Sequence, residues 1–107
     1  TPEPVPFRSE FTDYQPVLSP DGKTLFFNST RPSPPENQEG LQNLWFVTRT
    51  RTGWSEPQPV PGVNTPHREG YAAPVKSGDL YFNSDRPGGL GSQDIYVARK
   101  LRGGGYG

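Results

Sequence analysis

The sequence predicts an all-β fold made of two copies of one four-stranded unit. The first observation is a repeat: residues 25–32, LFFNSTRP, return as 80–87, LYFNSDRP, and residues 43–47, NLWFV, return as 94–98, DIYVA. The second is that the apolar runs are short and are separated by segments rich in proline and glycine, as strands are separated by turns. The third is that apolar residues never recur at helical spacing over a useful length. A repeat of this length indicates a solenoid, a propeller or an array.

The first copy contains four expected strands, over residues 14–19, 23–30, 43–49 and 54–60. The first strand ends at the turn signal SPDG, residues 19–22, where proline presets one dihedral angle and glycine accepts a positive one. The apolar residues 25–27 are continuous, which is expected when both faces of a strand are covered. Pro57 and Pro59 cannot donate hydrogen bonds to a ladder, so the fourth strand should lie at an edge.

The second copy has three expected strands, over residues 71–75, 79–84 and 94–100. The segment 53–55, GWS, returns as 105–107, GYG, but nothing after it corresponds to the first copy's EPQPVP, residues 56–61. A similar segment, TPEPVP, stands at residues 1–6. We therefore expect residues 1–7 to be this missing outer strand, displaced to the front of the chain and supplied to the second unit of a neighbouring chain.

Composition narrows the class of protein. Eleven basic and eleven acidic residues cancel and form no basic stripe, so nucleic acid or an anionic membrane is not expected as the main partner. There is no cysteine and hence no disulfide framework. No apolar run approaches the twenty or so residues of a membrane span, and no signal peptide is visible. Because the chain begins with Thr1, we expect that an upstream segment was removed or that the chain was excised or engineered.

Several motifs together resemble the TolB-like, or WD-like, β-propeller repeat. They are residues 19–27, SPDGKTLFF, residues 80–89, LYFNSDRPGG, with DIYV at 94–97, residues 53–57, GWSEP, and the pair Asn64-Thr65. The resemblance implies two four-stranded antiparallel propeller blades, over about residues 14–60 and 70–107. Residues 76–78, KSG, depart from the usual Pro-Asp-Gly, which puts that turn's type in doubt.

The resemblance also implies a kind of function. Members of the family are commonly exported, which would place a natural protein in the periplasm or outside the cytoplasm. They resemble scaffolds that bind ligands or partners more than catalysts. Some form the non-catalytic part of larger peptidases or of cell-envelope proteins.

Two blades alone would leave an apolar face of each blade in water, and repeat units generally need three or more copies to bury a continuous core. We expect the chain to associate head to tail with itself, most simply as a homotrimer that closes a six-bladed ring; four chains would give eight blades. The residues expected to carry this assembly are Pro2, Pro4, Val5, Phe7 and Tyr106. The alternative is that the chain is a segment of a longer propeller.

No catalytic constellation and no cofactor motif is visible, so we expect a protein that is not an enzyme. The residues expected to line a ligand site, if there is one, are those near the predicted channel entrance, together with the loop over residues 33–42: Arg8, Glu10, Asp13, His67, Arg68 and Glu69. Loops on a rigid scaffold carry function more often than strands do.

Other residues have a structural and a functional interpretation, and the structural one is favoured for each. His67 is expected to be a solvated loop residue, with a metal shared around a trimer axis as the alternative. Asp21 and Asp85 should organise turns, and Asp94 should accept hydrogen bonds from backbone groups or from Arg86, rather than bind calcium. Arg31 and Arg86 should brace strands or blades rather than bind phosphate or sugar acids. The aromatic side chains should pack between blades rather than stack on sugars: Trp45, Trp54, Tyr96 and Tyr106.

The expected function is therefore a non-enzymatic, self-assembling propeller that acts as a scaffold or binding module, and an engineered or reconstructed building block fits this description. Two alternatives stay open. One is a natural periplasmic module that binds a glycan or an envelope protein. The other is an accessory propeller segment of a larger hydrolase.

Overall fold

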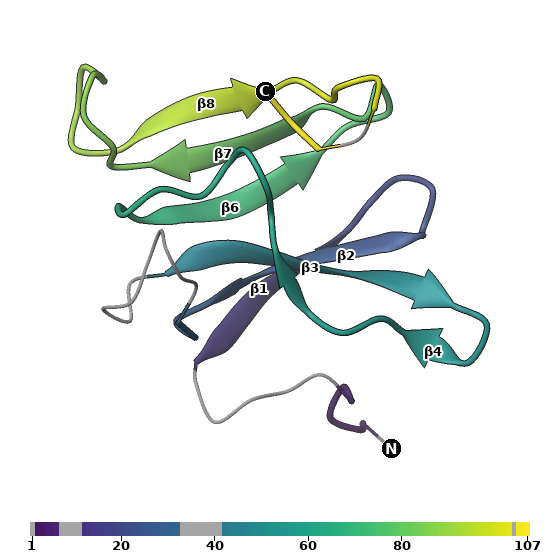
Figure 1. Cartoon of the computed structure of the whole chain (residues 1–107). Helices are drawn as coiled ribbons and strands as arrows, with labels where there is room; N and C mark the ends of the chain where they lie inside the picture. Colours follow the sequence, from purple (N-terminus) through teal and green to yellow (C-terminus); the bar gives the residue numbers. More distant parts are fainter. Residues whose placement is uncertain (1, 7–11, 33–41, 104) are drawn as a thin grey trace.

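Two antiparallel β-sheets pack against each other in the computed structural model of the chain (Figure 1). The structure describes residues 2–6, 12–32, 42–103 and 105–107. No residue in these ranges is helical, so the predicted all-β class is confirmed. For the same ranges, no helix exists that could cross a membrane.

The first sheet has the order β1 (Asp13–Leu18), β2 (Thr24–Ser29), β3 (Asn43–Thr50). The outer edge of β3 is covered by two short strands, β4 (Gly53–Trp54) and β5 (Gln58–Pro59). The fourth strand expected over residues 54–60 is thus divided in two. Its prolines explain both its position at the edge and its interruption, because a proline donates no ladder hydrogen bond.

The second sheet has the order β6 (Glu69–Pro74), β7 (Leu80–Ser84), β8 (Asp94–Ala98). A bridge between Lys100 and Tyr106 follows β8, at the place where Arg49 pairs with Trp54 beside β3. Among the described residues, no counterpart of β5 lies along β8. Residues 2–6 lie on the far side of the first sheet from the second one (Figure 1).

The two copies share details that the motifs do not cover. Gln15 in β1 and Tyr71 in β6 have φ values of 56° and 54°, and each lies at a bulge in its strand. The turn at residues 76–78 repeats the geometry of the turn at 19–22: Gly78 N donates to Val75 O, and Gly22 N donates to Ser19 O, both at 2.9 Å. Both glycines have positive φ. The second turn therefore has the same form as the first, and its glycine is sufficient for it although the usual proline and aspartate are absent.

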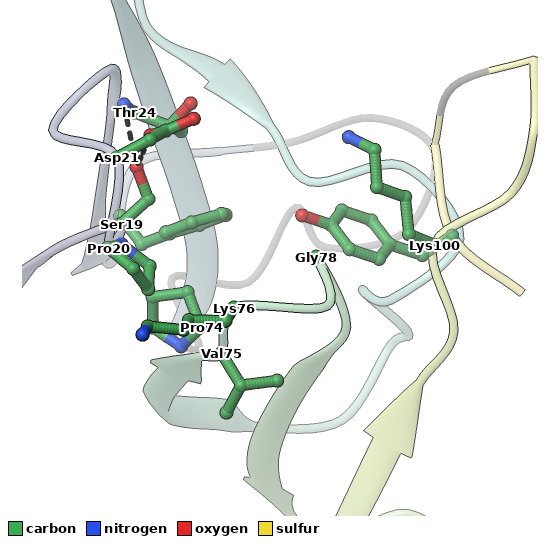
Figure 2. A pocket seen from close by; sticks show the side chains of 11 residues that line it. Ser19, Pro20, Asp21, Thr24, Pro74, Val75, Lys76, Gly78 and Lys100 are labelled. Atoms are coloured by element: carbon green, nitrogen blue, oxygen red, sulfur yellow. Dashed lines mark hydrogen bonds between the residues drawn. The ribbon is translucent and has the colours of Figure 1, made fainter.

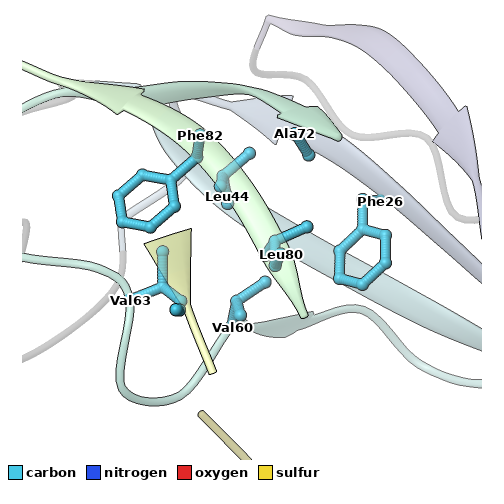
Figure 3. Close-up of a cluster of buried hydrophobic side chains, with 8 residues drawn as sticks. Phe26, Leu44, Val60, Val63, Ala72, Leu80 and Phe82 are labelled. Atoms are coloured by element: carbon cyan, nitrogen blue, oxygen red, sulfur yellow. The ribbon is translucent and has the colours of Figure 1, made fainter. Parts of the chain in front are cut away.

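The main core lies between the two sheets (Figure 3). The first sheet and the segment after it contribute Phe26, Leu44, Val60 and Val63, and the second sheet contributes Ala72, Leu80, Phe82 and Ala98. A second cluster covers the other face of the first sheet, around Phe27, Trp45 and Val47. Because neighbouring residues on a strand point to opposite faces, the continuous apolar run at residues 25–27 supplies both clusters.

Candidate functional site: a groove between the two sheets

The predicted ligand-binding residues that the structure describes lie where β1 begins (Asp13) and where β6 begins (His67, Arg68 and Glu69), and their side chains have different roles. Glu69 is completely buried. Its carboxylate accepts hydrogen bonds from Asn43 Nδ2 at 2.6 Å, from Thr65 N at 3.0 Å and Thr65 Oγ1 at 2.6 Å, and from Ser84 Oγ at 3.0 Å, and Arg86 lies 3.4 Å away. Burial raises the pKa of Glu69 in spite of these donors. These five residues, called here the Glu69 cluster, join the two sheets and the segment between them.

The Glu69 cluster has a smaller counterpart in the first sheet. Ser29 Oγ donates to Asp13 at 2.6 Å, and Arg31 reaches the same carboxylate oxygen at 3.0 Å. Each arginine also lies over two aromatic rings, Arg31 over Phe27 and Trp45 and Arg86 over Phe82 and Tyr96, all with 5.0 to 5.4 Å to the ring centroid. Both arginines therefore act as internal braces. The carboxylates of Asp13 and Glu69 bind these arginines and the neighbouring hydroxyl groups, so both have a structural role.

The remaining predicted site residues do not converge on a pocket with these two. Arg68 pairs with Asp85 at 3.4 Å on the exposed surface, and the backbone oxygen of His67 accepts from Asn43. Arg8, Glu10 and the assembly residue Phe7 lie outside the described residues. In the part of the chain that the structure describes, no three potential metal ligands gather.

Two other aspartates act in loops and turns. Asp21 accepts from Ser19 Oγ at 2.6 Å and from Lys23 N at 2.9 Å, and these bonds hold its pKa below the ordinary value. Asp94 accepts from the backbone N–H of Gly91 rather than from Arg86.

The opposite ends of the strands enclose a groove between the sheets. One part, of about 320 Å³, lies between the turn after β1 and the turn after β6 (Figure 2). A second part, of about 210 Å³, shares four of its lining residues with the first: Thr24, Phe26, Lys100 and Tyr106. We call the two parts together the inter-sheet groove. Its size falls in the range of roughly 300–1,000 Å³ that is usual for small-molecule sites.

One wall of the groove is a face of β2 and β3. Thr24 is directly opposite Thr48 in the register of these strands, and Phe26 is directly opposite Phe46. The two phenylalanine rings lie with their centroids 6.4 Å apart and are tilted by 42°. This wall therefore offers apolar rings beside two hydroxyl groups.

The other wall is held by the hairpin that contains Lys100 and Tyr106. Lys100 N donates to Asp79 Oδ1 at 2.8 Å, which ties the hairpin to the turn after β6. The side chain of Lys100 passes over Gly78, where an added Cβ would lie 2.6 Å from Lys100 Cδ. Burial raises the pKa of the Tyr106 phenol. Figure 2 shows Lys100 across the opening from Ser19, Asp21 and Thr24.

The groove was not predicted from the sequence as a binding site, although the repeat contains an indication of it. Where the first sheet has the pair Thr24 and Thr48, the second sheet has Asp79 and Arg99, which form an ion pair at 3.1 Å. The two copies therefore differ in charge at this pair of positions, because two neutral hydroxyl groups in the first sheet correspond to an ion pair in the second. Tyr106, predicted for assembly, is half-buried in the groove wall.

Comparison of the chain with protein-family models, with curated proteins and with solved structures gives no match.

Proposed function

We propose that the chain is a pair of β-propeller blades that assembles head to tail with copies of itself, most simply as a six-bladed homotrimer, and serves as a non-catalytic scaffold or binding module. The observation that carries the proposal is an exposed apolar face on the second sheet. The equivalent face of the first sheet is buried against the second sheet.

The repeat allows this comparison residue by residue. Leu44 is completely buried between the sheets, whereas its counterpart Ile95 is 76% exposed. Phe26 is 3% exposed, whereas its counterpart Tyr81 is 39% exposed. Burying a side chain of this size contributes about 1.5–3 kcal/mol, so the second sheet gains substantially if a further blade covers it. The first sheet of another copy can cover this face, because the two sheets within one chain already pack face to face in the same way.

The edge of β8 supports the same proposal. In the first sheet, β5 pairs with β3, with Pro59 opposite Trp45 and Gln58 opposite Phe46, and the next residue, Val60, is 1% exposed. Residues 2–6 repeat this segment, and their Val5 is 42% exposed.

By this equivalence, residues 2–6 of a second copy would lie along β8 with Pro4 opposite Tyr96 and Glu3 opposite Val97. Val5 would then enter the core as Val60 does. Strand addition of this kind combines main-chain hydrogen bonds with burial of alternate side chains.

A matched pair of variants tests the proposal. Ile95→Asp places a charge on the exposed face, whereas Leu90→Asp places one on a fully exposed loop residue outside the strands. We expect Ile95→Asp to lower the mass measured by light scattering to that of one chain and Leu90→Asp to leave the oligomer unchanged. An Ile95→Asp protein that keeps the wild-type mass would refute an interface at this face.

A further inference from the structure

The inter-sheet groove lies within one chain, and an inference about it stands apart from assembly. We propose that the groove binds a small sugar acid, with the carboxylate at Lys100 and the sugar ring between Tyr106 and the wall made by β2 and β3. Three features of the groove argue for this class of ligand: its charge, its aromatic surfaces and its hydroxyl groups.

The charge of the lining fits a single carboxylate. Lys76 and Lys100 bring two positive charges and Asp21 brings one negative charge, so the first part of the groove has a net charge of plus one. The Asp21 carboxylate already accepts two hydrogen bonds from its own turn. The opposite wall holds Lys100 by its backbone bond to Asp79 and by the contact of its side chain with Gly78. These contacts position the backbone and the stem of this exposed side chain, and its ammonium group can pair with an anion.

The aromatic and hydroxyl groups fit a sugar ring. Phe46 and Tyr106 are partly exposed and line the groove beside the buried Phe26, and aromatic faces pack well against the C–H faces of a saturated ring. Thr24 and Thr48 lie side by side among them and offer hydroxyl groups that both donate and accept. A purely apolar acid forms no hydrogen bonds with these hydroxyl groups, and a neutral sugar forms no ion pair with the lysines.

The contrast with the second sheet supports a role for the threonine pair. At the equivalent position, next to the pair Leu80 and Ala98, Asp79 and Arg99 form an ion pair. The threonines of the first sheet are uncharged and open onto the groove. The first copy of the repeat thus has two uncharged hydroxyl groups where the second copy has an ion pair.

Titration of the isotope-labelled protein with glucuronate, followed by amide chemical shifts in NMR spectra, tests the proposal. Glucose, which lacks the carboxylate, and benzoate, which lacks the hydroxyl groups, are the matched ligands. We expect saturable shifts with glucuronate at the amides of Gly78, Lys100 and Tyr106, and at least about tenfold weaker binding of the other two ligands. Equal binding of benzoate would refute a sugar ligand, and equal binding of glucose would refute the role of charge.

Variants separate the groove from general surface charge. Lys100→Gln and Thr24→Val should each weaken glucuronate binding, the first by about tenfold, while leaving the spectrum otherwise folded. Lys23→Gln is the control, because Lys23 is exposed on the turn after β1 but does not line the first part of the groove. The absence of saturable shifts in the wild-type protein, or an equal effect of Lys23→Gln, would overturn the proposal.

Discussion

Asn43 Nδ2 on β3 donates a hydrogen bond of 2.6 Å to Glu69 Oε1 on β6, and both side chains are completely buried. The same amide group also donates to the backbone oxygen of His67, at 3.1 Å. This contact joins the two sheets through buried polar groups, in addition to the apolar core between them. A buried carboxylate with several donors fixes the relative position of the elements that supply them, because a shift of either sheet would leave the charge without partners.

The first prediction concerns the pH dependence of stability. Burial raises the pKa of Glu69 above its ordinary value of 4.5. Between 4.5 and the raised value, the folded state holds more protons than the unfolded chain, so this group makes the free energy of unfolding decrease as the pH rises through that window. Glu69→Gln removes the titration. We expect wild-type minus variant stability, from urea unfolding, to decrease from pH 4.5 upwards and then level off.

A difference that increases with pH over the same window would contradict this assignment. Below the window other groups take over. Hydrogen bonds lower the pKa values of Asp21 and Asp79 from 3.8, so their contributions are present above that value and are lost as the pH falls through their folded pKa values. Both aspartates are common to the wild type and the variant and cancel in the difference.

The second prediction concerns the shape of the arginine side chain. Arg86 bonds the backbone oxygen of Val63 at 2.6 Å, bonds Ser84 and lies over two aromatic rings. A lysine cannot reproduce these contacts together, so Arg86→Lys should lower the free energy of unfolding by about 1–3 kcal/mol. Arg68→Lys, at an exposed ion pair, should change it by less than about 0.5 kcal/mol. Equal effects of the two variants in urea unfolding would rule out the brace.

The third prediction concerns a close approach of two backbone segments. Gly62 has a φ of 79°, and an added Cβ would lie 2.3 Å from the backbone oxygen of Tyr106. Gly62→Ala should therefore destabilise the protein by more than about 1 kcal/mol and loosen the hairpin that forms one wall of the groove. At Gly103 nothing lies within 4 Å, and Gly103→Ala should have little effect. Thermal unfolding of the two variants makes the comparison; similar melting temperatures would show that the close approach is absent.

The fourth prediction transfers a feature from one copy of the repeat to the other. The double variant Thr24→Asp, Thr48→Arg places the ion pair of Asp79 and Arg99 at the same register position in the first sheet. Because the pair lies near the surface, stability should change by no more than about 1 kcal/mol. Binding of glucuronate in the groove should be lost, as observed by NMR. Retained binding would mean that the threonine hydroxyl groups have no part in the site.

Much of the fold could be predicted from the sequence because the repeat is also a repeat of turns and apolar runs. The strands expected over residues 14–19, 23–30, 43–49, 71–75, 79–84 and 94–100 agree with the observed ones to within about two residues. Residues 2–6, the described part of the strand expected over residues 1–7, form no strand within the chain. The division of the outer strand into β4 and β5 was not predicted. Proline indicates an edge strand but does not determine which of the neighbouring residues pair with β3.

The candidate site was less predictable for a physical reason. Glutamate is a common residue type in binding sites, so the sequence favoured Glu69. Only the fold shows that this side chain is buried and accepts hydrogen bonds from Asn43, Thr65 and Ser84. The groove depends on Lys100 and Thr24, which are distant in sequence and unremarkable in type. Their proximity follows from the way the two sheets pack, and local sequence patterns do not determine that packing.

Sedimentation equilibrium of the wild-type chain tests the central proposal of assembly most directly. The chain has a mass of 11.8 kDa. If the exposed face and the open edge of β8 are completed by copies of the chain, the protein should sediment as one species with three times that mass at micromolar concentration. A single species of 11.8 kDa up to millimolar concentration would contradict the proposal.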